Sequence, residues 1–249
     1  MPNWCENTLI ISNTNNELDK FLNENKTNEN DLDFNCVCRC PDELYNTESP
    51  NKNNDKVKEL VEKYGYSDWY SWCCNNWGTK WNSSDVDYYK EDNTLTYSFN
   101  TAWGPPSAWF RKLCDKYSNF ELTLKYEECG MDFGGVMTYT NNELFEDEYI
   151  LSECIWENCD QNYVYETINH VISINNDDLE NIDDLTDQVI EILYDEIDNA
   201  HSIYSIINEK ITEELENKKN ENKTHEIESL KDSILNYNDK GINIENLNL

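Results

Sequence analysis

Trp77-Gly78-Thr79-Lys80-Trp81 and Thr101-Ala102-Trp103-Gly104-Pro105-Pro106 are the two stretches of this chain that say most about its fold. A third stretch, Tyr126-Glu127-Glu128-Cys129-Gly130, has the same character, with an aromatic side chain close to a glycine. Glycine allows a tight turn or a close approach of two backbones, and tryptophan buries a large apolar area. The three stretches therefore indicate an aromatic core that is built around sharp turns.

Strand and helix patterns surround these stretches. Residues 4–12 alternate in polarity and are rich in β-branched side chains, which predicts a strand. Apolar residues recur at helical spacing over residues 57–64, and Gly65 follows at the position typical of a helix C-terminus. The predicted elements are strands and helices in the order β, α, β, α, β, β, α, β, β, over residues 4–12, 17–25, 31–40, 57–64, 87–101 (a hairpin that turns at 90–93), 107–117, 120–126 and 131–140. Two βαβ-like halves with antiparallel neighbours predict an α+β fold, a ferredoxin-like antiparallel sandwich with one insertion.

The pattern weakens after residue 142. Residues 148–154 fit either an edge strand or the start of a helix, and residues 162–174 fit another strand. The chain is therefore predicted to have three parts. These are a ferredoxin-like domain over residues 1–145, an extension that fits edge strands over residues 146–175, and an acidic amphipathic α-helical tail over residues 176–249.

The tail has a helical pattern of its own. From Ile182 onward, apolar residues follow one helical face for up to about ten turns, and we expect a break near Asn199. Residues 218–224 are polar and predict a disordered link. A last short helix is expected over residues 226–237, ending at Gly241.

The charge of the chain narrows the choice of partners. Its net charge is −32; residues 1–145 hold 24 acidic and 13 basic side chains, and residues 146–249 hold 27 and 6. Nucleic acid is not an expected partner, because affinity for phosphate backbones comes largely from Lys and Arg, and the only arginines are Arg39 and Arg111. An acidic surface suits a basic protein partner, divalent cations or solubility alone.

The sequence also bears on location. It has no stretch of about 18 apolar residues that could span a membrane, and its N-terminus lacks the basic and apolar regions of a signal peptide. We therefore expect an intracellular, cytoplasmic protein that does not associate with membranes. Ten cysteines in such a chain are expected to be reduced thiols.

The three opening stretches combine with Met1-Pro2-Asn3-Trp4-Cys5-Glu6-Asn7, with Cys40-Pro41-Asp42-Glu43-Leu44 and with Phe133-Gly134. In this order they resemble the YubB-like proteins, a family with a ferredoxin-like domain that phages, plasmids and some viruses encode. The resemblance covers residues 1–140 and implies a ferredoxin-like fold whose molecular function is unassigned. The chain departs from the family pattern at Asn82, where the family tends to carry Asp.

Cys36, Cys38 and Cys40 are the candidate metal ligands. Alternate residues of a strand point to one face, so the predicted strand places three thiols together. Zinc-binding cysteines usually lie in turns, however, and alternate strand residues are roughly 6 to 7 Å apart, a poor spacing for one ion. Free cysteine is also among the most buried residue types, so core packing is the simpler interpretation.

The tryptophan-rich stretches supply a candidate ligand cleft, in which Lys80 is the cation and the rings offer stacking surfaces. Its residues are Trp77, Gly78, Lys80, Trp81, Trp103, Glu127 and Glu128. The simpler interpretation is that the tryptophans build a core. Neighbouring residues of a strand face opposite sides, so Glu127 and Glu128 do not form a dyad by spacing.

No catalytic set is evident in residues 1–145, because the three histidines, His170, His201 and His225, lie outside them. We predict no cofactor. The sequence favours a non-catalytic intracellular interaction module of a virus or mobile genetic element, whose acidic helices contact the partner. The alternative is a small-molecule- or metal-dependent enzyme that uses the tryptophan-lined cleft.

Overall fold

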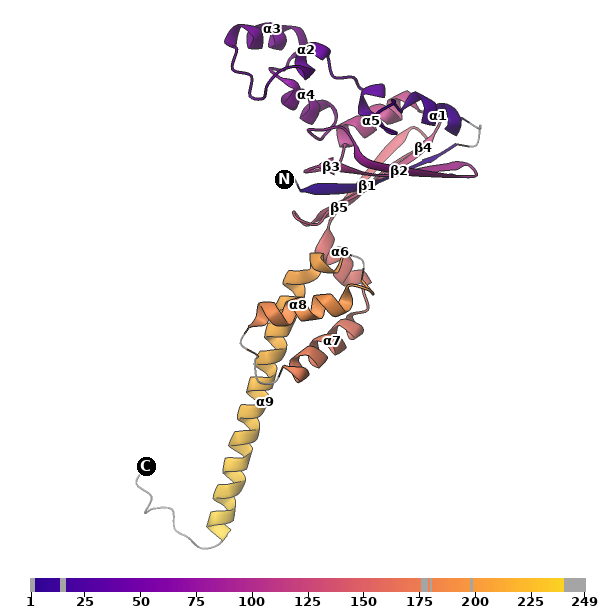
Figure 1. Cartoon of the computed structure of the whole chain (residues 1–249). Coiled ribbons are helices and arrows are strands. Elements are labelled where there is room, and N and C mark those ends of the chain that lie inside the picture. The colour runs from indigo at the N-terminus through magenta and orange to yellow at the C-terminus, as the bar shows by residue number, and fades with distance from the viewer. Residues whose placement is uncertain (1–2, 14–16, 176–178, 180, 198, 240–249) are drawn as a thin grey trace. The chain divides into compact units, whose positions relative to one another are not determined.

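The structure is a computed structural model that describes residues 3–13, 17–175, 179, 181–197 and 199–239. The chain forms two units, Met1–Cys154 and Ile155–Leu249. Each unit has a core of buried apolar side chains of its own. Figure 1 shows the elements of both units, which are described separately below.

The first unit is built on a six-stranded antiparallel sheet with the order β2-β3-β1-β4-β5-β6. Its strands are β1 (Trp4–Ser12), β2 (Ser84–Glu91), β3 (Thr94–Ala102), β4 (Glu121–Glu128), β5 (Phe133–Thr140) and β6 (Glu143–Ile150). The predicted first strand is confirmed, and it lies in the middle of the sheet, between β3 and β4. Its side chains alternate between the two faces of the sheet: Cys5, Leu9 and Ile11 are buried on one face, while Trp4 and Glu6 are exposed on the other.

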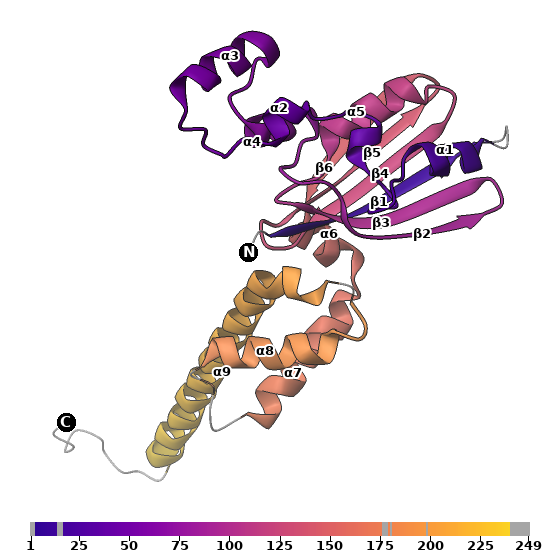
Figure 2. The ribbon, with the colours of Figure 1, turned by 45° about the horizontal axis from the view of Figure 1, so that its top comes forward.

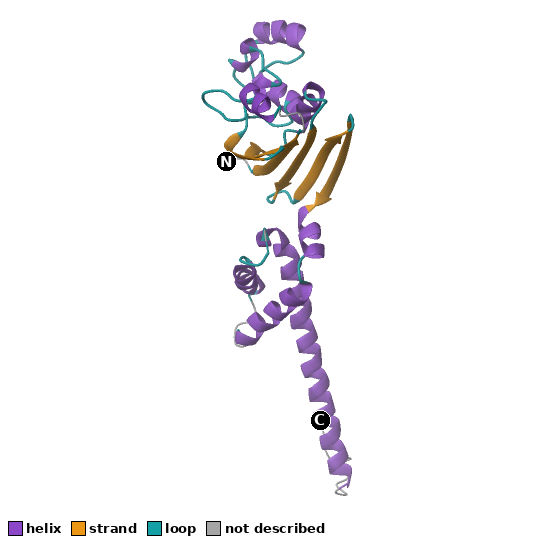
Figure 3. Cartoon of the chain, turned by 90° about the vertical axis from the view of Figure 1, so that its right-hand side faces the viewer, coloured by secondary structure: helices purple, strands orange, loops and turns teal. Residues whose placement is uncertain are grey.

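The helices of the first unit gather on one face of this sheet (Figures 2 and 3). They are α1 (Leu18–Glu24), η1 (Phe34–Cys36), α2 (Asp42–Tyr45), α3 (Asn54–Tyr64), α4 (Trp69–Asn76) and α5 (Ser107–Lys116). Between them and the strands lies the aromatic core, in which the rings of Phe34 and Trp109 have centres 4.5 Å apart. The predicted α+β class is therefore confirmed.

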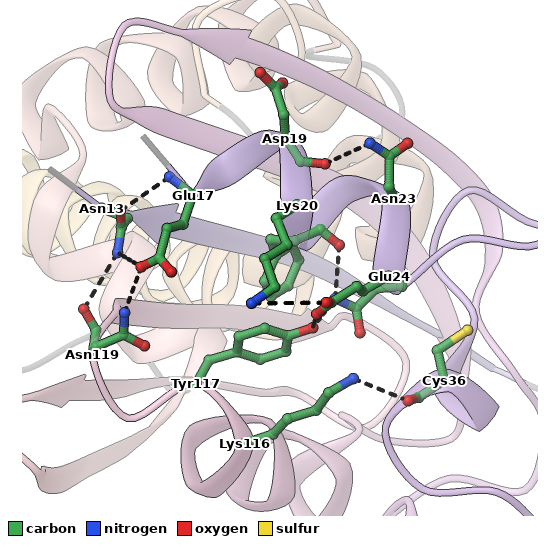
Figure 4. Close-up of polar contacts among 12 residues, drawn as sticks. Asn13, Glu17, Asp19, Lys20, Asn23, Glu24, Cys36, Lys116, Tyr117 and Asn119 are labelled. Atoms are coloured by element: carbon green, nitrogen blue, oxygen red, sulfur yellow. Dashed lines mark hydrogen bonds and ion pairs between the residues drawn. The ribbon is translucent and has the colours of Figure 1, made fainter. Parts of the chain in front are cut away.

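Polar contacts connect α1 to the end of α5 and the turn that follows it (Figure 4). Tyr117 donates a hydrogen bond to Glu24 Oε2 at 2.9 Å and accepts one from Asn25 Nδ2 at 2.8 Å. Asn119 Nδ2 donates to Glu17 Oε2 at 2.6 Å. These hydrogen bonds join α1 and its two ends to the residues that follow α5.

The strand predicted over residues 31–40 is wrong. This segment forms the short 3-10 helix η1 and a loop, because the side chain of Asp33 accepts the backbone N–H of Asn35 at 2.9 Å and turns the chain. Helix α4 was not predicted, although Asp68 caps it by accepting the N–H of Ser71 at 3.0 Å. The left-handed C-terminal cap at Gly65, with φ of 80°, is confirmed.

The second unit is helical. It contains the second half of α6 (Leu151–Asn158), then α7 (Gln161–Ile174), α8 (Ile182–Leu193), η2 (Ala200–Ile203) and α9 (Tyr204–Asp239). Buried side chains of α7, α8, η2 and the first part of α9 form its core. No helix among the described residues is both long and apolar enough to cross a membrane.

Several expectations for this half of the chain need correction. Residues 162–174 form helix α7 and not a strand, because Asp160 caps the backbone N–H groups of Asn162 and Tyr163. Residues 218–224 continue α9 and are not a link. Residues 148–154 contain both predicted states, the end of edge strand β6 and the start of α6. The break near Asn199 is confirmed by its left-handed φ of 58°, and Gly241 lies outside the described residues.

Helix α7 gives the first testable prediction. In a strand, Ile168 and Ile174 would share a face, but in a helix they lie roughly 120° apart, and here Ile168 is fully buried while Ile174 is 62% exposed. We expect Ile168→Ala to lower the free energy of unfolding by about 2–4 kcal/mol and Ile174→Ala to change it by less than about 0.5 kcal/mol. Urea unfolding followed by circular dichroism measures both, and similar losses in the two variants would contradict the helix.

Candidate functional site

The tryptophan surface, which we define as Trp4, Lys80, Trp81 and Trp103, lies at one end of the sheet in the first unit. Trp4 begins β1, Lys80 and Trp81 follow α4, and Trp103 follows β3. The three tryptophans are 40%, 41% and 47% exposed. The rings of Trp4 and Trp81 have centres 6.1 Å apart. The ammonium of Lys80 lies 3.8 Å from the ring centre of Trp81 and 5.7 Å from that of Trp103.

Trp103 is held in an unusual backbone conformation. Its φ is 71°, in the left-handed region that bulky residues rarely adopt. Its backbone N–H donates to Asn3 O at 3.0 Å, and next to it Thr101 Oγ1 donates to Gly104 O at 2.8 Å. The fold therefore tolerates a strained turn whose result is a half-exposed indole.

Trp77, which is buried, anchors the segment that leads to Lys80 and Trp81. Its indole Nε1 donates to Cys38 O at 2.8 Å, and its backbone carbonyl accepts the N–H of Trp109 at 3.1 Å. Gly78 has φ of 91° and passes so close to the start of α5 that a Cβ would lie 2.9 Å from Pro105 O and from Ser107 N. Thr79 Oγ1 then donates to Ala102 O at 2.9 Å. Residues 77–79 are thus fastened to both α5 and β3.

A small cavity of about 290 Å³ opens beside the tryptophan surface. It is lined by Tyr45, Trp69, Cys73, Trp77, Lys80, Trp81 and Asn82. Three of the predicted cleft residues, Trp77, Lys80 and Trp81, line this cavity, and Gly78, Trp103, Glu127 and Glu128 do not. Trp103 contacts Lys80 from outside the lining of this cavity.

The two predicted carboxylates are elsewhere. Glu128 is buried on the helix side of the sheet, where its Oε1 accepts the N–H of Gly130 at 3.0 Å. Glu127 faces the opposite side, next to Glu6 on β1, and both line a separate cavity of about 340 Å³. The structure therefore does not bring Glu127 or Glu128 to Lys80, and the acid and base of the alternative enzyme are not assembled.

The three candidate metal ligands are also separated. Because residues 31–40 are not a strand, their thiols share no face. The backbone carbonyl of Cys36 accepts from Lys116 at 3.1 Å (Figure 4), and Cys38 Sγ lies 3.0 Å from Lys112 Nζ. Cys40 is buried. In the part of the chain that the structure describes, no three His, Cys, Asp or Glu side chains are grouped to hold a metal ion.

Sequence reasoning missed a buried polar network behind the tryptophan surface. Asn7 Nδ2 donates to Cys5 O and to Thr101 Oγ1, both at 2.8 Å, and connects β1 to β3 below Trp103. The inward position of Asn7, between Cys5 and Leu9 in an alternating strand, was the signal that could have revealed it. Trp4 was missed too, although the same alternation points it outward.

Gly78 gives the second prediction. Gly78→Ala is expected to lower the free energy of unfolding by about 2–4 kcal/mol, since the new Cβ meets backbone atoms at an unfavourable φ. Gly104→Ala is the matched control, because nothing lies within 4 Å of the Cβ position there. Thermal unfolding of both variants compares them, and an equal change would show that residues 77–79 are not fastened as described.

Cys5 gives the third prediction, on pH. Burial raises the pKa of the Cys5 thiol to about 12, from 9.0 for an ordinary thiol. Between these values the unfolded chain loses the proton that the folded chain keeps, so this contribution to stability is complete below pH 9 and is lost as the pH rises. From pH 8 to pH 10.5 we expect wild type to lose about 1–2 kcal/mol more unfolding free energy than Cys5→Ala. Urea titrations of both proteins at the two pH values measure these free energies of unfolding. Equal losses in wild type and Cys5→Ala would contradict the burial of the thiol.

Comparison with known proteins supports the fold class. Residues 76–167 match the family model described as a ferredoxin-like domain in Api92-like protein. The chain is similar to the crystal structure of a protein api92 from Yersinia pseudotuberculosis, with 19% identity and a TM-score of 0.31, over 34% of this chain and 32% of that chain. The match thus spans about a third of that protein's length, and no curated protein matches. The ferredoxin-like prediction is confirmed for residues 76–167, whereas the matching model is described as Api92-like and not as YubB-like.

Proposed function

We propose that the first unit is a non-catalytic interaction module that binds a protein partner through the tryptophan surface. The observation that carries this proposal is Trp103, a large apolar side chain that is 47% exposed at a strained φ. Strain of this kind costs on the order of 1–3 kcal/mol, and it is concentrated at sites where function requires it. Glycine at position 103 would remove the strain, so the exposed indole needs another reason.

The composition of the surface suits protein recognition. Tryptophan is enriched among the residues that dominate binding free energy at protein interfaces. Lys80 lies between the rings of Trp81 and Trp103, and Trp4 packs beside Trp81, so the three half-exposed tryptophans form an apolar patch that contains one polar group. This is the arrangement expected of a small interface core. Lys80 is already oriented over Trp81, so little side-chain entropy remains to be lost when a partner binds.

The acidic second unit supports a further part of the proposal, that the partner is basic. Opposite charge accelerates the encounter of two proteins, and residues 146–249 hold most of the excess negative charge. The expectation that nucleic acid is not a partner rests on the same charge. The origin in a virus or mobile element and the cytoplasmic location stay predictions from the sequence.

The proposal is tested with two substitutions in the tryptophan surface and one outside it. The partner is first captured from an extract of the cells that encode the chain, then purified and titrated by calorimetry. We expect Trp81→Ala and Trp103→Gly each to weaken binding at least tenfold, while Trp103→Gly unfolds at the same or a higher temperature because the strain is released.

Tyr89→Ala is the matched control, since Tyr89 is 61% exposed on β2 and outside the tryptophan surface. It should bind the partner as wild type does. Unchanged affinity in both tryptophan variants would refute the role of the surface. If Trp103→Gly instead lowers the unfolding temperature, the side chain of Trp103 contributes to stability, and its retention at a strained φ no longer argues for a role in binding.

A further inference from the structure

Cys38 and Lys112 contact each other through their two reactive atoms. Cys38 lies in the loop after η1, and Lys112 lies in α5. The ammonium Nζ of Lys112 donates a hydrogen bond to Cys38 Sγ at 3.0 Å. The sulfur atoms of Cys36 and Cys40 have longer contacts, 4.0 Å and 3.8 Å, and each of these is to a backbone carbonyl oxygen. Of these three thiols, Cys38 therefore has the close contact, and its partner is an amine.

Both reactive atoms are held in place by other hydrogen bonds. The backbone N–H of Cys38 donates to Phe34 O at 2.9 Å, and its carbonyl accepts from Trp77 Nε1 at 2.8 Å. Lys112 Nζ also donates to Asn76 Oδ1 at 2.8 Å and to Asn76 O at 3.2 Å. Two groups that are already oriented toward each other react faster than the same groups on mobile side chains.

The Cys38–Lys112 pair lies at the edge of the core and not inside it. Cys38 is half-buried, whereas Cys40 and Cys73 are buried. Lys112 is half-buried as well. A molecule as small as a hydroperoxide can therefore reach this thiol from solvent without passing through the core.

We propose that Cys38 and Lys112 form a reversible covalent link, a sulfenamide S–N bond, when the folded chain meets a hydroperoxide. The link would be a modification site that joins the loop after η1 to helix α5. The proposal does not depend on the tryptophan surface being an interaction site.

The atoms and electrons of the reaction balance. The Cys38 thiolate attacks one oxygen of the peroxide O–O bond, which breaks; an S–O bond forms, and the departing oxygen leaves as water or an alcohol with the thiol proton. The sulfur has lost two electrons and the peroxide has gained them. The Lys112 ammonium then gives one proton to solvent, and its nitrogen attacks the sulfenic sulfur. The S–N bond forms, the S–O bond breaks, and the hydroxide leaves as water with a second proton from the nitrogen. The same condensation is known between a sulfenic acid and a backbone nitrogen.

Cys36 and Lys116 provide an internal control. Cys36 is half-buried like Cys38, and a lysine lies next to it, since Lys116 Nζ donates to Cys36 O at 3.1 Å. Figure 4 shows, however, that the sulfur of Cys36 is directed away from this amine. Because proximity and orientation of the reacting atoms govern the rate, we expect at least about tenfold more Cys38–Lys112 link than Cys36–Lys116 link.

The experiment treats the full-length, folded and freshly reduced chain with a small excess of hydrogen peroxide. Remaining thiols are alkylated in denaturant, and the chain is digested without reductant for peptide mass mapping. We expect a peptide pair that joins Cys38 to Lys112, with the summed mass of the two peptides less two hydrogens, and its separation by dithiothreitol. Cys38 recovered only as a sulfinic acid or in a disulfide, with Lys112 unlinked, would overturn the proposal, and so would equal amounts of the Cys36–Lys116 link.

Three variants make the result specific. Lys112→Arg keeps a cation beside Cys38 but removes the nucleophilic amine. It should abolish the link while the sulfenic acid at Cys38 still forms and is trapped by dimedone. Cys38→Ser should abolish the link as well, and Lys116→Arg is the matched control that should leave it intact. If the variants at 38 or 112 fail to fold, the wild-type chain treated in buffer and in denaturant still decides, because the link must be lost when unfolding separates the two side chains.

Discussion

The indole of Trp77 is the contact on which the rest of the first unit depends. It is 1% exposed, and it packs edge-on against Phe34 and Trp72. The indole N–H of Trp77 donates to Cys38 O, its backbone N–H donates to Cys73 O in α4, and its backbone carbonyl accepts the N–H of Trp109 near the start of α5. Because the indole N–H of Trp77 is buried, losing its bond to Cys38 O would leave an unsatisfied donor in the core, at a cost of about 1–3 kcal/mol. The segment anchored by Trp77 leads directly to Lys80 and Trp81, whereas the pairing of β1 with β3 places Trp4 opposite Ala102.

A second constraint comes from the polar network behind that surface. Asn7 satisfies the carbonyl of Cys5 and the hydroxyl of Thr101, and Thr101 in turn donates to Gly104 O. A buried amide that lost these bonds would cost about 1–3 kcal/mol, so the network strongly favours the turn at residues 103–104. The hydrogen bonds of this network offset the unfavourable backbone conformation of Trp103. They hold the turn in place, and the indole therefore stays exposed.

The sequence predicted the parts of the fold whose patterns are local. Alternation identified β1, and the glycine after residue 64 identified the end of α3, because each depends on neighbours in the chain. The strand predicted over residues 31–40 was wrong because the capping side chain of Asp33 outweighed β-propensity. Residues 162–174 were mistaken for a strand because a short apolar run has no decisive period. For the site, the shared composition of the two tryptophan-rich stretches suggested that Lys80, Trp81 and Trp103 lie near one another, as they do. The place of Trp4 beside Trp81 depends on the tertiary structure and could not be read from the sequence.

The position of the Lys80 ammonium determines which parts of the tryptophan surface are accessible. The ion pairs found among the described residues join other cations to carboxylates, for example Arg111 to Glu146 and Lys63 to Glu43. Lys80 instead lies over two indole rings, where the cation is attracted by the negative ring faces. The inner faces of Trp81 and Trp103 are then occupied, and what remains for a partner is the outer faces and ring edges, together with the N–H donors of Lys80. If the proposed partner binds there, we expect the surface to discriminate by shape and by apolar contact more than by charge. In the same proposal, the excess carboxylates elsewhere on the chain would act at longer range, on the rate of encounter.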